Sequence, residues 1–284
     1  MEMAKTKVIL LAALASALCS CGNSYHWTRH YIDGHRTGVV APAEDNVDDA
    51  LGVFDGPVYV APNGKRFSGG ATPEVAGLLR DVQPEMSRLK EIIAYAPAPM
   101  EKHRPESSLS NFIVDHLFAD VQELVAGSGR KVDLAISNFG GIRCDLPQGN
   151  ILLDDIEAML PFDNYLCYVK LEGRTLRKVF EYMAAGKVQC VSGVKLHIKD
   201  STLVSCEIGG APLDDDRLYG LATIDFLLDG GDNYQLARGQ KDYFITDVKI
   251  GEAIVKDIRA LTAAGKPLEW KTDGRVVIER TPKK

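Results

Sequence analysis

The sequence contains 284 residues, with 33 Lys and Arg against 39 Asp and Glu, which gives a formal net charge of −6 at neutral pH. Hydrophobic residues make up 45% and charged residues 25%, the proportions of a folded globular protein rather than a disordered chain. This acidic balance argues against a protein that binds a nucleic acid polymer through its phosphates. A membrane protein with several spans is also excluded, because only the extreme N-terminus carries a segment apolar enough to enter a bilayer.

The N-terminal segment has the layout of a bacterial export signal. Two lysines precede an apolar run at 8–18, which is shorter than a membrane-spanning helix. Residues 18–22 read Leu-Cys-Ser-Cys-Gly and resemble the lipobox of a bacterial lipoprotein. Cys21 fits the lipidated position, because Cys19 would have a leucine directly before the cut. We therefore expect a signal peptide at 1–20 and an exported protein, lipid-anchored in the cell envelope and facing the periplasm. The alternative is a signal peptide cut elsewhere, or a buried hydrophobic start.

Residues 21–56 form a mixed polar stretch without a clean period, and we expect a tether there, followed by one domain at 57–284. The first helix of that domain is predicted from Thr72-Pro73, which resemble a cap and a first turn. Pro84 is expected to break or kink this helix before its apolar pattern continues to Ile93. A second helix is predicted from Ser110, with one apolar face formed by Ile113, Leu117, Val121 and Leu124.

The remaining segments alternate between helical and extended patterns. The sequence predicts a strand at 132–136, a loop at 137–143, a short helix at 154–160, a strand at 165–171, a helix at 175–185 closed by Gly186, a hairpin of 194–198 with 203–208, a strand at 218–224, a helix at 251–263 and a strand at 275–278. Interleaved helices and antiparallel hairpins favour an α+β domain with mixed α/β layers.

Four cysteines lie within the predicted domain: Cys144, Cys167, Cys190 and Cys206. Their wide spacing, without a Cys-x-x-Cys pair, disfavours a zinc site. An exported compartment permits disulfides, but all four lie in or beside apolar stretches, where a free buried cysteine is at least as common. Their pairing is therefore left open.

Three stretches combine residue types suited to ligand binding. Residues 138–143, Asn-Phe-Gly-Gly-Ile-Arg, follow a predicted strand. The glycines allow close approach of the backbone, Asn138 offers donors and an acceptor, and the fork of Arg143 matches phosphate oxygens. The alternative is a glycine turn with a surface arginine.

The other two stretches each place a phenylalanine at the end of an element. Phe162 lies in Leu-Pro-Phe-Asp-Asn at 160–164, and Phe226 precedes Gly-Gly-Asp at 230–232. A single phenylalanine is more often a core residue. Two rings at element ends can instead stack on a purine or pyrimidine, and Asp232 can accept hydrogen bonds from a ribose diol.

In this order the three motifs resemble the C-terminal domain of the 5′-nucleotidase family. Residues 171–176, 191–194 and 106–115 resemble further segments of that domain. The resemblance implies the fold of this domain and a nucleotide ligand whose base lies between two phenylalanine rings. By position in the motifs, it assigns Phe162 and Phe226 as the rings, Asn138 to the base, Asp232 to the ribose hydroxyls, Arg143 to the ribose–phosphate end and Asn164 to the lining of the site. A further family arginine maps to Arg104, with Lys102 as the alternative.

Family enzymes also carry a metallophosphatase domain that binds two metal ions, and its Asn-His-Glu and Asp-x-His-x-x-Asp stretches do not occur in this sequence. We therefore expect no catalytic residue, metal or cofactor on this chain, and a separate metallophosphatase chain with a divalent metal pair as its partner. Whether the chain counts as an enzyme stays open. Two alternatives remain: a free-standing nucleotide- or nucleoside-binding lipoprotein, and a structural lipoprotein that kept the fold without the site.

Overall fold

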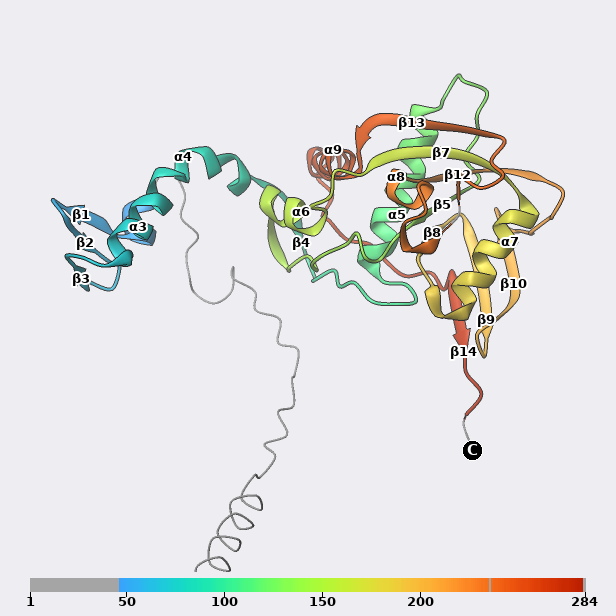
Figure 1. Cartoon of the computed structure of the whole chain (residues 1–284), viewed down its shortest axis with the longest axis horizontal. Coiled ribbons are helices and arrows are strands. Elements are labelled where there is room, and N and C mark those ends of the chain that lie inside the picture. Colours follow the sequence, from blue (N-terminus) through green and yellow to red (C-terminus); the bar gives the residue numbers. More distant parts are fainter. Residues whose placement is uncertain (1–45, 235, 283–284) are drawn as a thin grey trace, which may run out of the picture. The chain divides into compact units, whose positions relative to one another are not determined.

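The computed structural model describes residues 46–234 and 236–282. A five-stranded mixed sheet organises the domain (Figure 1). Its strands, in spatial order, are β13 (Asp242–Lys249), β7 (Tyr165–Glu172), β12 (Leu218–Ile224), β5 (Leu134–Ser137) and β8 (Cys190–Ser192). Only β12 and β5 run parallel; the other neighbours are antiparallel. The central strands are buried on both faces, which explains why they are almost continuously apolar in sequence.

Helix α5 (Ser108–Leu124) packs against four strands of this sheet. Its buried face includes Leu109, Phe112, Ile113, Leu117 and Val121, whereas Leu124 is 40% exposed. The helix begins after Ser107, whose hydroxyl accepts from the Ser110 backbone amide, and the Ser110 hydroxyl accepts from the Ser107 backbone amide.

A second sheet holds the hairpin of β9 (Val194–Lys199) and β10 (Thr202–Ile208), which confirms the predicted hairpin. The sheet has β11 (Ala211–Pro212) at one edge and β14 (Val276–Glu279) at the other, the latter parallel to β9. Helix α7 (Gly173–Tyr182) contacts β10 and β7 and continues into η3 (Met183–Lys187), where Gly186 has a φ of 101°. The predicted closure of this helix by Gly186 is confirmed.

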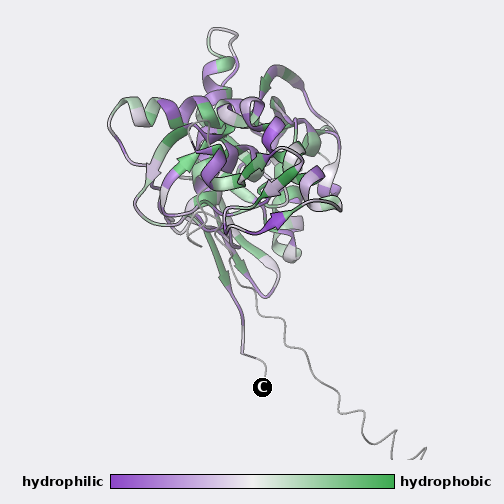
Figure 2. Ribbon diagram, turned by 90° about the vertical axis from the view of Figure 1, so that its left-hand side faces the viewer, coloured by the Kyte–Doolittle hydropathy of each residue, from purple (hydrophilic) through white to green (hydrophobic). Residues whose placement is uncertain are grey.

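The remaining elements of the domain surround these sheets. They are β4 (Ile92–Ala96) paired with β6 (Gly149–Leu152), α6 (Leu153–Met159), α8 (Asp225–Leu228), η4 (Gly231–Asn233) and α9 (Ile250–Ala263). Helix α9 contacts β4, α5, α6 and β13. Figure 2 shows hydrophobic colouring on several strands, while the helices carry both hydrophobic and hydrophilic residues.

The described N-terminal part differs from the prediction. It contains α2 (Val47–Leu51), the sheet of β1 (Val53–Asp55), β2 (Val58–Val60) and β3 (Arg66–Phe67), then α3 (Ala71–Asp81), α4 (Gln83–Met86) and η2 (Ser87–Lys90). Strand β1 lies before residue 57, the predicted start of the domain, and pairs with β2, which lies after it. Regular structure therefore begins inside the stretch expected to be a tether.

The first predicted helix was also wrong at both ends. It begins at Ala71 rather than after Thr72, with Gly70 at the cap. Ile92 and Ile93 do not continue it, because Glu91 takes an extended backbone conformation and Ile92 pairs with Leu152 of β6. A strand partner remote in sequence thus overrides the local helical spacing.

The mixed α+β class predicted from the sequence is confirmed. The four cysteines of the domain are free thiols, and burial raises the pKa of Cys167, Cys190 and Cys206 to about 12. In the described part of the chain, no helix is long and apolar enough to cross a membrane. Cys21 and the expected signal peptide lie outside the described residues.

Candidate nucleotide-binding site

The loop after β5 meets the turn after β12 through one side-chain hydrogen bond. Asn138 follows the last residue of β5 and is 5% exposed. Its Nδ2 donates to Oδ2 of Asp232 over 3.3 Å, which joins two motifs 94 residues apart. Its Oδ1 is buried and accepts no hydrogen bond within the described residues, so this acceptor is left unsatisfied.

A glycine is required beside Asn138. A Cβ added at Gly141 would lie 2.7 Å from Asn138 Oδ1, closer than real Cβ atoms approach such an oxygen. The glycine in this motif therefore leaves room for the asparagine side chain rather than merely allowing a turn.

Asp232 lies in a tight turn in which three residues have positive φ. Gly230 has a φ of 96°, Asp232 of 52° and Asn233 of 62°, a region that Asp and Asn tolerate better than most residues. The hydroxyl of Tyr182 donates to the backbone carbonyl of Asp232 over 3.3 Å. The turn is thus supported from α7 while the Asp232 residue stays exposed.

Gln189 makes a second contact with the Asp232 carboxylate. It is 4% exposed, and its Nε2 donates to Asp232 Oδ2 over 3.0 Å. Its Oε1 accepts from the backbone amide of Phe139 over 2.8 Å. Sequence reasoning missed this residue, since a lone glutamine before an apolar strand carries no motif.

Phe226 lies beside the same turn. Its residue is 41% exposed, and a Cβ on Gly231 would come within 2.5 Å of two ring carbons. Only glycine therefore allows the ring to lie against the backbone next to Asp232.

Phe162 and Asn138 line the same small cavity. Phe162 is 47% exposed, and the guanidinium carbon of Arg143 lies 5.7 Å from its ring centroid. Arg143 also donates to the carbonyl of Gly140 over 3.2 Å. Phe162, Asn138, Gly141 and Asn164 line one small cavity of about 10 Å³. The structure thus groups Phe162 with Arg143 and Asn164, and Phe226 with Asp232, and Asn138 touches both groups.

Arg104 and Lys102 both contact the 138–143 loop. The guanidinium carbon of Arg104 lies 4.7 Å from the ring centroid of Phe139, and Nε donates to the carbonyl of Val188 over 2.9 Å. The Nζ of Lys102 donates to the carbonyl of Ile142. Arg104 therefore borders the loop near Gln189, and Lys102 borders it next to Arg143.

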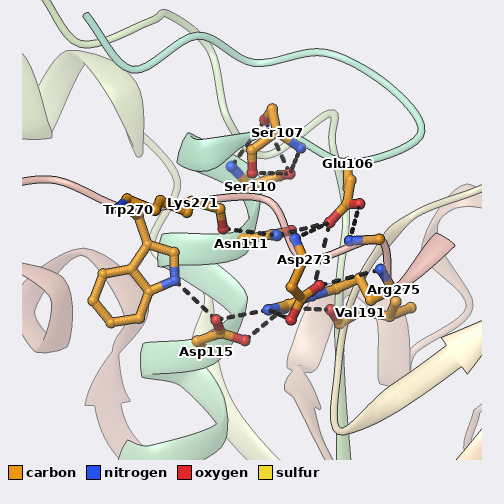
Figure 3. A network of polar contacts seen from close by, with 11 residues as sticks. Glu106, Ser107, Ser110, Asn111, Asp115, Val191, Trp270, Lys271, Asp273 and Arg275 are labelled. Carbon is orange, nitrogen blue, oxygen red and sulfur yellow. Dashed lines mark hydrogen bonds and ion pairs between the residues drawn. The ribbon is translucent and has the colours of Figure 1, made fainter. Parts of the chain in front are cut away.

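A polar network anchors Glu106, which follows Arg104 by two residues (Figure 3). Arg275, 8% exposed, donates to both oxygens of Asp115 over 2.6 and 3.0 Å, and to Asp273 over 2.8 and 3.0 Å. It also donates to the carbonyl of Val191 in β8 over 3.0 Å. The backbone amide of Gly274 donates to Glu106 over 2.8 Å. This network joins Glu106 and α5 to the turn before β14.

A larger cavity of about 910 Å³ lies on the α6 and α9 side of Phe162. Three cations on its lining are paired: Lys249 with Asp163 at 2.9 Å, Arg88 with Glu157 at 3.2 Å and Arg259 with Glu91 at 2.6 Å. No three His, Cys, Asp or Glu side chains within 46–234 and 236–282 are grouped as the ligands of a metal ion would be.

Comparison with known proteins finds similar domains in nucleotide hydrolases. Residues 90–238 match the family described as "5'-nucleotidase, C-terminal domain". A probable 5′-nucleotidase of Treponema pallidum is 26% identical over 186 residues, which are 56% of this chain and 30% of that protein. An apyrase of Tabanus yao is 29% identical over 221 residues, 66% of this chain and 38% of that protein.

Solved structures show the same fold. The structure of a 5′-nucleotidase precursor from Thermus thermophilus superposes with a TM-score of 0.64 at 24% identity, covering 79% of this chain and 46% of that one. The NAD nucleotidase of Haemophilus influenzae gives a TM-score of 0.56 at 20% identity, covering 76% and 42%. The predicted fold of a 5′-nucleotidase C-terminal domain is confirmed. The chain spans less than half the length of each of these relatives.

Proposed function

Because the chain belongs to the 5′-nucleotidase C-terminal domain family, we propose that it recognises the nucleotide for a 5′-nucleotidase-type hydrolase in nucleotide catabolism. The hydrogen bond between Asn138 and Asp232 is the observation that carries the proposal. It brings together the two polar groups that a nucleoside requires, one for the base and one for the ribose. A structural lipoprotein that kept the fold without the site would not need an exposed carboxylate held beside a buried, unsatisfied amide oxygen.

Each group has a role that its chemistry suits. The Asn138 side-chain amide addresses the polar edge of the base, and the base stacks between Phe162 and Phe226, which are both about half exposed. Asp232 accepts from the ribose hydroxyls. Arg143 lies over Phe162 and presents its remaining donors to the ribose–phosphate end. Asn164 lines the Phe162 side of the site.

Arg104 completes the proposed site as a second cation. Its Nε is engaged by Val188, which leaves its terminal nitrogens for a phosphate or a base edge. We keep Lys102 as the alternative, since it approaches the same loop.

The proposal includes a catalytic partner. A separately encoded metallophosphatase chain would supply the divalent metal pair, which activates water and stabilises the departing oxygen in two-metal phosphatases. This chain would hold and orient the nucleotide for that centre. The relatives named as 5′-nucleotidases are longer than the region that this chain matches.

We also propose that the protein is a lipoprotein of the bacterial cell envelope, attached through Cys21 and facing the periplasm. The short apolar run and the Leu-Cys-Ser-Cys-Gly sequence support this placement. Replacing Cys21 with Ala should abolish incorporation of labelled palmitate and release a soluble, folded protein. Incorporation that survives this change would point to Cys19 or another anchor.

The test of the function is calorimetric titration of the purified protein with AMP, GMP, CMP and UMP, followed by phosphate-release assays with divalent metal. We expect binding of at least one nucleotide and negligible phosphate release. Hydrolysis should appear when the partner metallophosphatase is added. Absence of binding to all four would refute the proposal, and robust release by this chain alone would refute the separate catalytic partner. Binding without hydrolysis in the presence of the partner would favour a free-standing nucleotide-binding lipoprotein.

A further inference from the structure

Gln189 joins two parts of the candidate site that are far apart in sequence. It lies just before β8, and its side-chain amide spans from the Phe139 backbone amide to the Asp232 carboxylate. The distances are 2.8 and 3.0 Å, and the residue is 4% exposed. The bridge therefore links the loop that carries Asn138 to the turn that carries Asp232.

The orientation of this amide is fixed by chemistry. The Phe139 amide can only donate, so the oxygen of Gln189 must face it and the nitrogen must face Asp232. The Asp232 carboxylate then receives two N–H donors on the same oxygen, Oδ2, from Gln189 and from Asn138. Its other oxygen, Oδ1, accepts no hydrogen bond from the described residues and is left for a ligand.

Asp232 needs such support. It lies at a φ of 52° in a short exposed turn, where a carboxylate without partners would sample several rotamers. Two buried amides hold the carboxylate in one orientation before any ligand arrives, which lowers the entropic cost of binding.

We propose that Gln189 is a positioning residue that fixes the Asp232 carboxylate for the cis-diol of a ribonucleoside, and so contributes to selection of ribose over sugars without that diol. The inference rests on the proposed function, since it assumes that Asp232 addresses the ribose. It adds a residue from outside the three motifs, and it predicts that the selectivity depends on a side chain that does not itself touch the ligand.

The test replaces Gln189 with Glu. This variant keeps an acceptor for the Phe139 amide but presents a carboxylate in place of the donor to Asp232. Gln122→Glu is the matched control, because Gln122 likewise accepts from a backbone amide, that of Val132 over 2.8 Å, away from the site. The ligands are adenosine, guanosine, cytidine and uridine, each beside its 2′,3′-dideoxy analogue, so that no ligand phosphate titrates.

At pH 7.5 we expect Gln189→Glu to weaken ribonucleoside binding about tenfold and to leave dideoxynucleoside binding within twofold, while the control changes neither. At pH 5 the loss of ribonucleoside affinity in Gln189→Glu should be smaller. The introduced Glu, beside the Asp232 carboxylate, takes up a proton, and its O–H replaces the lost donor. In an Asp232→Asn background, Gln189→Glu should no longer lower ribose selectivity. A purely structural role for Gln189 would produce neither the pH rescue nor the dependence on Asp232.

Equal loss of both ligand classes in a variant with normal thermal melting would overturn the inference. If Gln189→Glu does not fold, Gln189→Asn is the deciding variant, because it keeps the amide but is too short to reach both partners. Its affinity for ribonucleosides must fall more than its affinity for dideoxynucleosides. A wild-type protein that binds ribonucleosides and dideoxynucleosides equally would overturn the inference while leaving nucleotide recognition intact. A wild-type protein that binds neither nucleosides nor nucleotides would refute the proposed function itself, and this inference with it.

Discussion

Replacing Arg275 with Ala should destabilise the domain strongly without touching the ligand. The guanidinium donates to Asp115, Asp273 and the Val191 carbonyl. Its removal takes the cation from Asp115, which keeps only the Trp270 donor, and takes the side-chain donor from the Val191 carbonyl. The side chain of Arg275 is 10% exposed and that of Asp115 is 20% exposed, whereas Asp273 is 57% exposed. Most of the cost should therefore come from Asp115 and Val191 rather than from Asp273.

The magnitude follows from this burial. Breaking a buried ion pair by removing one partner costs about 3–5 kcal/mol, and partial exposure of Asp115 places the expected loss near the lower end, about 3 kcal/mol. Arg259→Ala provides the control, since its 2.6 Å pair with Glu91 has side chains 49% and 46% exposed. Exposed pairs contribute about 0–1 kcal/mol, so this variant should melt close to the wild type.

The assay is equilibrium urea unfolding followed by circular dichroism and by tryptophan fluorescence. Trp270 donates to Asp115 over 2.9 Å, so its emission reports directly on this network. A loss below about 1 kcal/mol for Arg275→Ala, or equal losses for Arg275→Ala and Arg259→Ala, would refute the view that the buried network holds α5 to the segment before β14.

Other perturbations separate ligand binding from folding. Phe162→Ala and Phe226→Ala should each weaken nucleotide binding by about 1–3 kcal/mol in calorimetry with little change in thermal melting; melting far below wild type would show that the rings belong to the core. Arg143→Ala should weaken binding of nucleoside monophosphates more than of nucleosides, and equal losses would remove it from the phosphate end. Burial, and next the charge of Asp257, raises the pKa of Asp120 to about 6 from an ordinary 3.8. The folded protein therefore binds more protons than the unfolded chain between about pH 4 and pH 6, and this group lowers stability as pH rises through that window. Asp120→Asn should accordingly be more stable than wild type by on the order of 1–3 kcal/mol at pH 8 and indistinguishable at pH 4; a pH-independent difference between the two unfolding curves would contradict this assignment.

Prediction from sequence succeeded where local pattern and burial agree. Strand β12 matches its predicted bounds, and α5 and the β9–β10 hairpin lie where their apolar spacing placed them. It failed where pairing comes from elsewhere in the chain. Ile92 and Ile93 have helical spacing with the preceding residues but join β6, and β13 was missed because its side chains are largely exposed at the sheet edge and show no alternation.

The candidate site was likewise predictable from the sequence only in part. The motifs identified Asn138, Phe162, Phe226 and Asp232 as a set, and the structure brings Asn138 and Asp232 into contact. The clamp of two rings around a base stays a prediction. Gln189 could not be found from the sequence, because its role depends on the tertiary distance between a backbone amide and a carboxylate rather than on any spacing along the chain.

The network around Arg275 has a consequence for the order in which the protein matures. Asp115 precedes Arg275 by 160 residues. In a chain synthesised from its N-terminus, α5 is therefore present long before Arg275 is added. During that interval Asp115 lacks the cation that compensates its burial, and β9 lacks its parallel neighbour β14. The Arg275 network and the β9–β14 pairing therefore form only when the last turn and strand arrive. Any product that stops short of residue 275 lacks this network, so we expect it to be a readier substrate for proteases than the full chain.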